Sequence, residues 1–386
     1  MYLVIASYLP SANIYAQFID EISLINVNSV PESTRDKPQS KVWQHNGYWW
    51  AVIPTSASPT GTYLWRLDGD TWSKLIRLST NTSVHADTKA LNDITYILLI
   101  DDNAENAEFV RIQFSGGSYS LISGGPGSEI TISLDSGVET ATIDVDTQGR
   151  VWIASDEKII DVTSTANIYV RWSESPYSSW TRVTLATGLK KDDICAITAF
   201  TTSGTPKIGV LWSNQNDDHF HFKYRLDSED PATWHGPELA PPNQSGSFAD
   251  DHINFAVSGD GTIYAAVKTS YDSGSEMTIA LLKRESGGTW NVYNVTNSAA
   301  TRPIALLDDS NNKIYVIYTS SSNDIAYKYA NTTGFSFSAG SDMAIGTYNN
   351  VTSTKQAFSD EVVILYSSGS TWYGKREGTT TLPLPV

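Results

Sequence analysis

The chain has 386 residues, a formal net charge of −16 at pH 7 and a pI near 4.7. This acidity argues against nucleic acid or an anionic membrane as a partner, because both attract a basic protein face. Cys195 is the only cysteine, so an internal disulfide and a cysteine-based zinc site are excluded, and we expect a buried small side chain there. No apolar run reaches the roughly 18 residues that span a bilayer, so membrane insertion is not expected. The acidic composition, rich in Thr, Asn and Trp, is typical of an extracellular or cell-surface protein.

Residues 1–39 form the first predicted unit. They contain three strand-like runs, which are MYLVIAS (1–7), NIYAQFI (13–19) and EISLINV (21–27). A linker marked by Pro31 and Pro38 follows them. These strands have two interpretations, either the end of a preceding β-domain or an extra copy of the repeat that begins at residue 40.

From residue 40 onward, a short apolar strand recurs at intervals of 46 to 57 residues. Its copies are WWAVIP (49–54), TYILLI (95–100), VWIAS (151–155), IGVLWS (208–213), IYAAVK (263–268), IYVIYT (314–319) and VVILYS (362–367). Turns rich in Gly, Asn or Asp, and later a turn centred on an aromatic residue, divide each repeat into four strands. The pattern predicts an all-β protein, a seven-bladed β-propeller of four-stranded antiparallel blades over residues 40–386, with eight blades as the alternative. We expect the blades to begin near residues 40, 86, 140, 192, 250, 302 and 354.

Three of the Trp-centred turns, DGDTW (68–72), DSEDPATW (227–234) and ESGGTW (285–290), resemble degenerate Asp-boxes of sialidase-like propellers. The resemblance implies that these turns join the third and fourth strands of a blade, away from the channel, and that their Trp side chains serve packing. Sialidase chemistry needs an arginine triad to hold the substrate carboxylate. Arg302 is the only arginine at the expected channel positions, so sialidase activity itself is not expected.

Polar residues at one end of the predicted channel are the candidate ligand-binding set. In an antiparallel blade, the innermost strand begins where the second strand ends, so these two points meet at one opening. The positions so selected are Lys41, Asp87, Lys89, Asp193, Asp250, Arg302 and Lys355. The alternative interpretation is that such residues only solvate the channel.

The densest cluster lies in ADDHINFAVSGDGTIYAAVKTSY (249–271), where Asp250, Asp251 and His252 face Lys268 across one hairpin. This hairpin resembles part of the active site of propeller uronate lyases, whose first histidine matches His252. The family's second histidine would fall near Ser270, where the sequence has no imidazole. If the protein is an enzyme, the resemblance makes His252, Lys268 and Asp251 the candidate catalytic residues.

The favoured function is an extracellular binding module for a glycan or a surface protein. One alternative is a polysaccharide lyase or glycoside hydrolase acting on acidic polysaccharide, with a base beside cations that neutralise a carboxylate. Another is a structural subunit of a surface layer or filament. No cofactor and no catalytic metal are expected, and a structural Ca²⁺ held in the channel by Asp87, Asp193 and Asp251 stays open as an alternative.

The end of the chain, GTTTLPLPV (378–386), must be reconciled with closure of the ring. Its two prolines cannot donate to a strand ladder, so the segment suits only an edge strand. We expect it to be the outermost strand of the last blade, or to be displaced there by a strand from residues 1–30.

Overall fold

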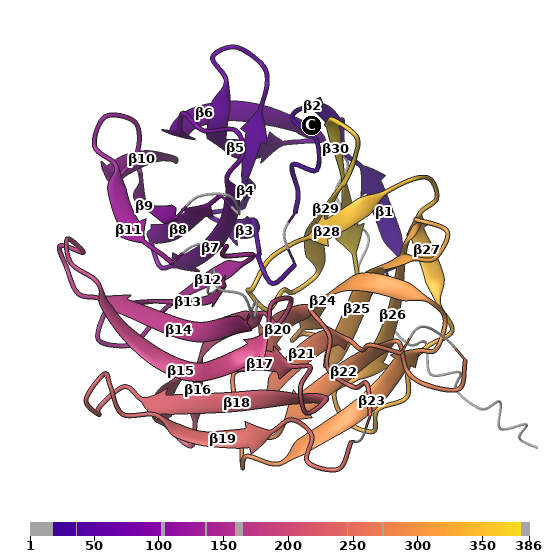
Figure 1. Ribbon diagram of the computed structural model, residues 1–386. Helices are drawn as coiled ribbons and strands as arrows, with labels where there is room; N and C mark the ends of the chain where they lie inside the picture. Colours follow the sequence, from indigo (N-terminus) through magenta and orange to yellow (C-terminus); the bar gives the residue numbers. More distant parts are fainter. Residues whose placement is uncertain are drawn as a thin grey trace, which may run out of the picture.

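The computed structural model describes residues 18–35, 37–101, 105–135, 137–158, 165–244, 246–271 and 274–379. This part of the chain contains 30 strands in seven antiparallel sheets, which surround a central channel as the blades of a propeller (Figure 1). It has no helix, and therefore none that is long and apolar enough to cross a membrane. The predicted seven-bladed β-propeller is confirmed.

In the first three blades the strands follow one another outward from the channel in chain order. Blade one has β3 (Val42–His45), β4 (Tyr48–Thr55), β5 (Gly61–Asp68) and β6 (Thr71–Ser79). Blade two has β7 (His85–Leu91), β8 (Ile94–Ile100), β9 (Asn106–Ser115) and β10 (Ser118–Ser123), and β11 (Ile130–Ser133) also pairs with β9. Blade three has β12 (Ala141–Val145), β13 (Val151–Lys158), β14 (Thr165–Ser173) and β15 (Thr181–Lys190).

Blades four to six repeat this order. Blade four has β16 (Cys195–Thr202), β17 (Thr205–Asn214), β18 (His219–Leu226) and β19 (His235–Leu239). Blade five has β20 (Ile253–Val257), β21 (Ile263–Lys268), β22 (Ile279–Arg284) and β23 (Trp290–Thr296). Blade six has β24 (Ala300–Asp308), β25 (Lys313–Ser320), β26 (Ile325–Asn331) and β27 (Ser341–Ala344). The first strand of every blade begins within five residues of the predicted start.

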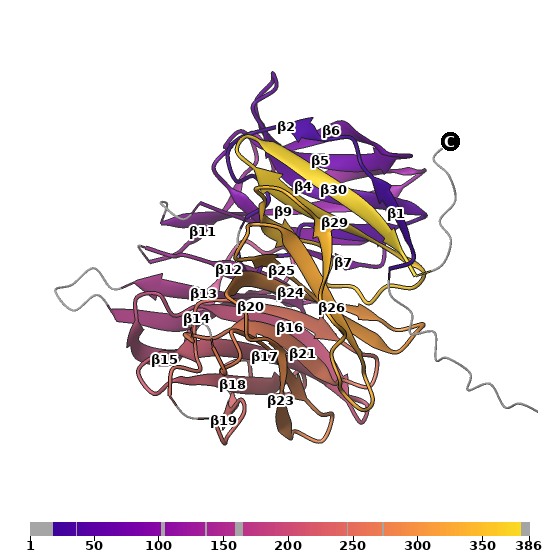
Figure 2. The ribbon, with the colours of Figure 1, turned by 90° about the vertical axis from the view of Figure 1, so that its right-hand side faces the viewer.

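Blade seven combines the two ends of the described chain. It has β28 (Asn349–Thr352), β29 (Glu361–Ser368), β30 (Thr371–Gly378) and, outermost, β1 (Asp20–Ser23). β2 (Val27–Asn28) also pairs with β30, and Figure 2 shows the N-terminal strands beside the C-terminal blade. Of the two expected closures of the ring, the strand from residues 1–30 is therefore the one observed. Residues 1–17 and 380–386 lie outside the described part, so the proposed division of the chain at residue 39 stays a prediction.

The hydrophobic core lies between neighbouring blades, where large side chains of one sheet meet the next sheet. Trp50 of β4, for example, is fully buried in a cluster with side chains of blade two. The Trp-centred turns join the third and fourth strands, and their aromatic rings serve packing as expected. Trp72 packs edge-on against Trp372 with 5.3 Å between the ring centroids, and Trp290 packs edge-on against Phe222 with 5.4 Å between them. Cys195 is buried, as predicted.

Polar side chains of the innermost strands link one blade to the next. An innermost strand has an edge whose backbone N–H groups lack a ladder partner, and a buried N–H group needs an acceptor. Side-chain oxygens of the preceding blade accept these bonds. Four such pairs are Asp87 with the N–H of Ile143 (2.7 Å), Thr142 with Ile197 (2.9 Å), Asp144 with Ala199 (2.9 Å) and Asn254 with Ala305 (3.1 Å).

Residues 34–35 and 37–40, here called the floor segment, cross one end of the channel instead of forming a free linker. They bond to the innermost strands of several blades. Thr34 donates to the carbonyl of Asn350 (2.7 Å), Gln39 donates to the carbonyl of Ala141 (3.2 Å), and the carbonyl of Pro38 accepts from Asn254 (3.3 Å). The backbone of Ser40 donates to Asp87 (2.8 Å) and accepts from the N–H of Thr88 (2.9 Å). The N-terminal segment therefore closes the ring and also lines the bottom of its channel.

Candidate functional site

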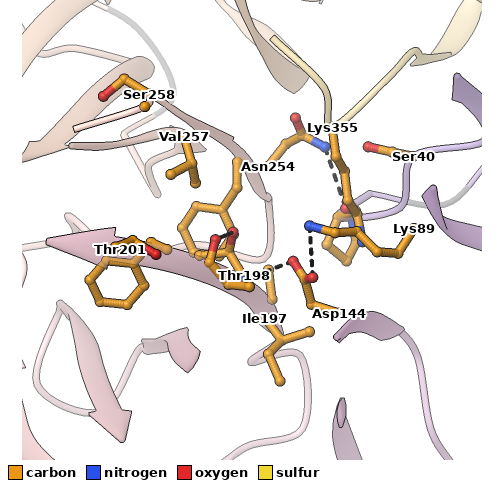
Figure 3. Close-up of a pocket in the computed structure, with 16 residues that line it drawn as sticks. Ser40, Lys89, Asp144, Ile197, Thr198, Thr201, Asn254, Val257, Ser258 and Lys355 are labelled. Carbon is orange, nitrogen blue, oxygen red and sulfur yellow. Dashed lines mark hydrogen bonds and ion pairs between the residues drawn. The ribbon is translucent and has the colours of Figure 1, made fainter. Parts of the chain in front are cut away.

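A cavity of about 290 Å³ occupies the channel (Figure 3). It extends from the floor segment to the end of β16 and the turn that joins the first two strands of blade five. Its lining residues are Pro38, Ser40, Lys89, Asp144, Ala196, Ile197, Thr198, Ala199, Phe200, Thr201, Asn254, Phe255, Val257, Ser258, Gly259 and Lys355. Two of the predicted ligand-binding residues, Lys89 and Lys355, are among them.

Lys89 is held in the cavity by a buried carboxylate. Its ammonium group lies 2.8 Å from Oδ1 of Asp144 (Figure 3). Asp144 also accepts the backbone N–H groups of Val145 (2.7 Å) and Ala199 (2.9 Å), so its position is fixed by the sheet. The side chain of Lys89 is 24% exposed and that of Asp144 only 1%, so the pair presents the ammonium donor to the cavity.

Lys355 repeats this arrangement close to Lys89, with which it lines the cavity (Figure 3). Its ammonium group lies 2.5 Å from Oδ2 of Asp87 and 2.8 Å from the carbonyl oxygen of Ile143. Asp87 is completely buried. Burial raises the pKa of its carboxyl group, while Lys355 and two backbone N–H donors oppose that shift. Here too the carboxylate is hidden and the ammonium group is the more accessible partner.

The rest of the cavity wall combines hydroxyl groups with aromatic carbon. Thr198, Thr201 and Ser258 contribute hydroxyls, and Phe200 and Phe255 contribute rings. Neutral donors and acceptors beside an apolar face are typical of small-molecule pockets. The wall comes mainly from the innermost strands β16 and β20.

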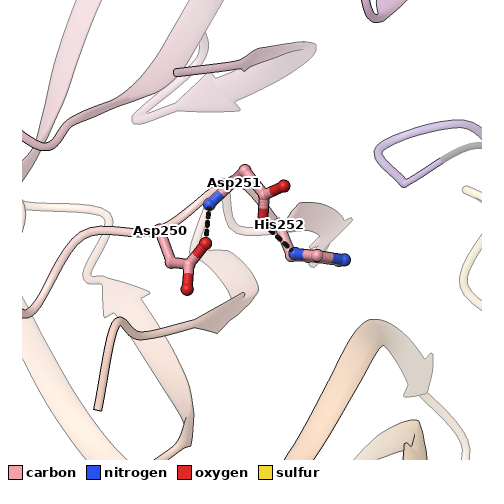
Figure 4. A group of neighbouring side chains, drawn as sticks. All are labelled: Asp250, Asp251 and His252. Atoms are coloured by element: carbon pink, nitrogen blue, oxygen red, sulfur yellow. Dashed lines mark hydrogen bonds and ion pairs between the residues drawn. The ribbon is translucent and has the colours of Figure 1, made fainter. Parts of the chain in front are cut away.

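Asp250, Asp251 and His252 lie near the floor segment and outside the lining of the cavity, and Figure 4 shows their arrangement. One ligand-type atom from each lies within 4.8 Å of the others, the only group of three such side chains this close in the part of the chain described. Lys268 forms an ion pair with Asp250, so the predicted proximity of these side chains is confirmed.

Lys37 of the floor segment neutralises this end of the channel. Its ammonium group pairs with Asp251 and, at 2.5 Å, with Oε1 of Glu139 from blade three. The side chain of Lys37 is only 8% exposed. Burial alone would lower the pKa of this ammonium group, but the two carboxylates raise it above the usual range. Lys37 is therefore a charged residue held inside the fold by two partners.

The protonation of the Asp250 cluster follows from burial and from these pairs. Burial raises the pKa of Asp250 to about 6, and the adjacent Asp251 adds to that shift. The pKa of Asp251 lies far below its usual range, because His252 and Lys37 together with Asp250 outweigh the effect of burial. Burial lowers the pKa of His252 to about 4, against the opposing effect of Asp251, so the imidazole is neutral near pH 7. Its Nδ1 atom lies 2.5 Å from Oδ1 of Asp251, and Nε2 lies 3.3 Å from the hydroxyl of Thr301.

The remaining predicted residues take other positions. Lys41 is completely buried, and it donates to Oε1 of Gln39 (3.0 Å) and to the carbonyl of Ala86 (2.9 Å). Asp193 accepts the backbone N–H groups of Lys190 (2.8 Å) and Gln215 (3.1 Å), which fixes a turn. The pKa of His252 is lowered further by the charge of Arg302, which places this arginine near the Asp250 cluster.

The expected single cluster at one opening is thus divided between the cavity and the end of the channel at the floor segment. Asp87, Asp193 and Asp251 do not come together as one group, so the channel Ca²⁺ alternative finds no support in the described residues. The binding and catalytic roles of the individual residues stay predictions. Lys37, Glu139 and Asp144 were not selected from the sequence. Of these, only Asp144 could have been placed in the channel, because it lies two positions after Thr142 on an innermost strand.

Solved structures with the same fold include carbohydrate-active and carbohydrate-binding proteins. The BP39L lectin from Burkholderia pseudomallei is similar with a TM-score of 0.57 and 10% identity, over 90% of this chain and 100% of that chain. A PL25 ulvan lyase bound to -[GlcA(1-4)Rha3S]- gives a TM-score of 0.55 and 8% identity, over 90% and 95%. The polysaccharide lyase Uly1 gives 0.53 and 9%, over 94% and 99%. At these identities the likeness establishes the seven-bladed propeller fold alone.

Searches with protein-family models and among curated proteins each find no match for this chain. The resemblance of its Trp-centred turns to Asp-boxes therefore has no support from a family model. The turns occupy the expected positions, but membership of the sialidase-like group does not follow from that.

Proposed function

We propose that this protein is a glycan-binding module and that the channel cavity is its binding site. The observation that carries the proposal is the lining of the cavity, where two lysine ammonium groups, several hydroxyls and a Phe200 ring surround one space. Sugars offer hydroxyl groups for such donors and acceptors and apolar C–H faces for aromatic carbon. A cavity of about 290 Å³ lies at the lower end of ligand pockets, which span roughly 300–1,000 Å³, so it suits one sugar residue of a longer glycan.

The two lysines favour a sugar that carries an anionic group. Their aspartate partners are buried behind them, so an incoming carboxylate or sulfate would meet ammonium donors first. Hydrogen bonds between charged partners are stronger than those between neutral groups. Lectins and polysaccharide lyases among the similar structures are consistent with a glycan ligand, although their fold does not specify one.

Binding is favoured over catalysis because the described lining of the cavity contains no histidine, tyrosine or cysteine that could take a proton. Both lysines are already paired with aspartates, Lys89 with Asp144 and Lys355 with Asp87. His252, the expected base of a lyase, is buried near the floor segment and does not line the cavity. We further propose an extracellular or cell-surface location, as the composition indicates, and keep a surface protein as the second class of partner.

A glycan array with the purified protein tests the proposal, followed by titration of any sugar that binds. The variant Lys89→Met removes one donor and keeps the aliphatic stem, and we expect it to bind a carboxylated or sulfated glycan at least about tenfold more weakly. Lys191→Met is the matched control, because Lys191 lies on an exposed turn outside the cavity lining. Equal binding by the parent and Lys89→Met would contradict the proposed site.

The lyase alternative is tested on uronate polymers by the ultraviolet absorbance of an unsaturated product. We expect no rise in absorbance. A rise that the His252→Ala and Lys268→Ala variants abolish while they keep the parental melting temperature would replace the binding proposal with catalysis at the Asp250 cluster.

A further inference from the structure

The seam where the N-terminal strand closes the ring contains a second cavity, about 150 Å³ in volume, between blades six and seven. Its lining residues are Phe18, Ile19, Asp20, Glu21, Tyr327, Asp342, Met343 and Glu377. Four of these eight side chains are carboxylates, which come from β1, β27 and β30. The channel cavity described above is a separate space with no residue in common.

The pairing of β1 with β30 brings two of these carboxylates face to face. Glu21 and Glu377 are directly opposite each other in the antiparallel register, so their side chains project from the same face of the sheet. Like charges in this arrangement repel and destabilise a strand pair. The closure of the ring thus depends on a pairing that is unfavourable unless something neutralises it.

The nearby lysine neutralises only one member of this pair. Lys375 forms an ion pair with Glu21. Glu377 is only 3% exposed, and its side chain forms no hydrogen bond or ion pair within the described part of the chain, although its backbone is paired in the sheet. A buried carboxylate without a partner is costly, and here it faces a cavity shared with three other acids.

We propose that this cavity is a divalent-cation site in which Glu377, Glu21, Asp20 and Asp342 provide the ligands. Carboxylate oxygens are hard ligands, and Ca²⁺ accepts six to eight oxygens in variable geometry, whereas Mg²⁺ demands a near-ideal octahedron. Ca²⁺ therefore fits a set gathered from three strands. These carboxylates stand further apart than the ligand atoms of the Asp250 cluster, so cation binding draws them together. The ion would join the closing strand to both blades and stabilise the ring.

The test uses the full chain at a fixed pH of 7.5. Its melting temperature is compared between EGTA and CaCl₂, and its affinity for Ca²⁺ is measured separately. We expect the parent to bind Ca²⁺ and to melt several degrees higher with it, because a ligand that binds only the folded state stabilises it. Glu377→Gln keeps the shape of the side chain and should lose most of the shift and about tenfold or more in affinity. Asp342→Asn should lose part of both.

Asp192→Asn is the matched control, since Asp192 is an exposed carboxylate far along the chain that does not line this cavity. It corrects for weak Ca²⁺ binding to an acidic protein and should respond as the parent does. Two results would overturn the proposal: no Ca²⁺ binding by the parent, or the same Ca²⁺ shift in Glu377→Gln as in the parent. MgCl₂ is the second probe, and an equal response to Mg²⁺ and Ca²⁺ would rule out the Ca²⁺ assignment.

Discussion

Carboxylates lie close together at two places where the N-terminal segment meets the propeller, and the two places differ in how these acids are paired with lysines. At the floor of the channel, Lys37 reaches from the N-terminal segment and pairs with both Glu139 and Asp251. At the ring seam, Glu21 faces Glu377 across the closing strand pair, and the side chain of Glu377 has no hydrogen-bond or ion-pair partner among the described residues. The first cluster is paired with a lysine of the N-terminal segment, and the second contains a buried acid for which the described chain supplies no cation.

This difference shows why a cluster of acids is not in itself a ligand site. The Asp250 cluster is the denser of the two, yet both of its aspartates already pair with lysines. The seam is sparser, but its most buried carboxylate faces an open cavity. The two clusters differ in whether the fold supplies a lysine for the most buried acid, because an ionised buried carboxylate without a partner costs several kcal/mol.

Deletion of residues 1–39 disturbs both regions and should have the largest effect. It removes β1 from the last blade and Lys37 from the channel floor, which leaves Glu139 and Asp251 without their cation. We expect a loss on the order of 5 kcal/mol or more, enough to unfold a domain of ordinary stability. Circular-dichroism melting and urea titration measure it. A truncated chain that melts within a few degrees of the parent would show that neither contact matters for stability.

The substitution Lys37→Met addresses the channel floor alone. It keeps the aliphatic stem but removes the lysine partner of two largely buried carboxylates, and breaking a buried ion pair costs about 3–5 kcal/mol. We expect a loss of about 3 kcal/mol in urea titration at pH 7. Lys191→Met, on an exposed turn, should stay within about 0.5 kcal/mol of the parent. Equal stability of the two variants would mean that Lys37 does not hold the floor segment in place. The channel floor would then not differ from the seam in this respect.

The free energy of unfolding should depend on pH because of the buried acid Glu377 at the ring seam. The pKa of Glu377 is about 8 in the folded protein, raised from 4.5 by burial and neighbouring acids. Between about pH 4.5 and pH 8 the folded chain keeps a proton that the unfolded chain has lost, so stability falls as the pH rises through this window. In EGTA we expect the stability of Glu377→Gln relative to the parent to increase by on the order of 3 kcal/mol from pH 5 to pH 8.

The pH comparison must be made as a difference between the two proteins, because His252 acts in the opposite direction. Its pKa of about 4 lies below the ordinary value of 6.5, so the unfolded chain binds the extra proton and stability is lost as the pH falls through that range. This contribution is common to the parent and Glu377→Gln and cancels. A difference that does not change with pH would mean that Glu377 is not the buried, protonated acid of the seam.

Much of the fold follows from local patterns that can be read along the chain. Trp50 and its counterparts in the other blades lie in the apolar second strand, which is bounded by turns rich in Gly, Asn or Asp. The start of each blade was therefore predicted within five residues. The Trp72 and Trp290 turns were also placed correctly, because turn chemistry and strand alternation depend only on near neighbours. The closure of the ring was narrowed to two options by the prolines of the last segment.

The candidate site was predicted only in part. Lys89 and Lys355 were selected as channel residues, and they do line the cavity. They were grouped with Asp250 and Lys268, which lie outside that lining. The antiparallel order of the strands predicts at which end of a blade a residue lies, but not how deep it lies along the channel. Asp144 was missed, since its role depends on a lysine and a backbone amide from two other blades.

The sequence by itself determined the repeat, the propeller fold and the structural role of the Trp-centred turns, since these rest on the period of the strands and on residues close in the chain, whereas the structure decided for seven blades over eight. Only the tertiary structure decided that Glu21 faces Glu377, and that Lys37 closes one end of the channel beside Asp251. The first pair is separated by 356 positions in the chain and the second by 214. Contacts over such distances arise when the ring closes, and no local pattern of residue types encodes which charges will then meet.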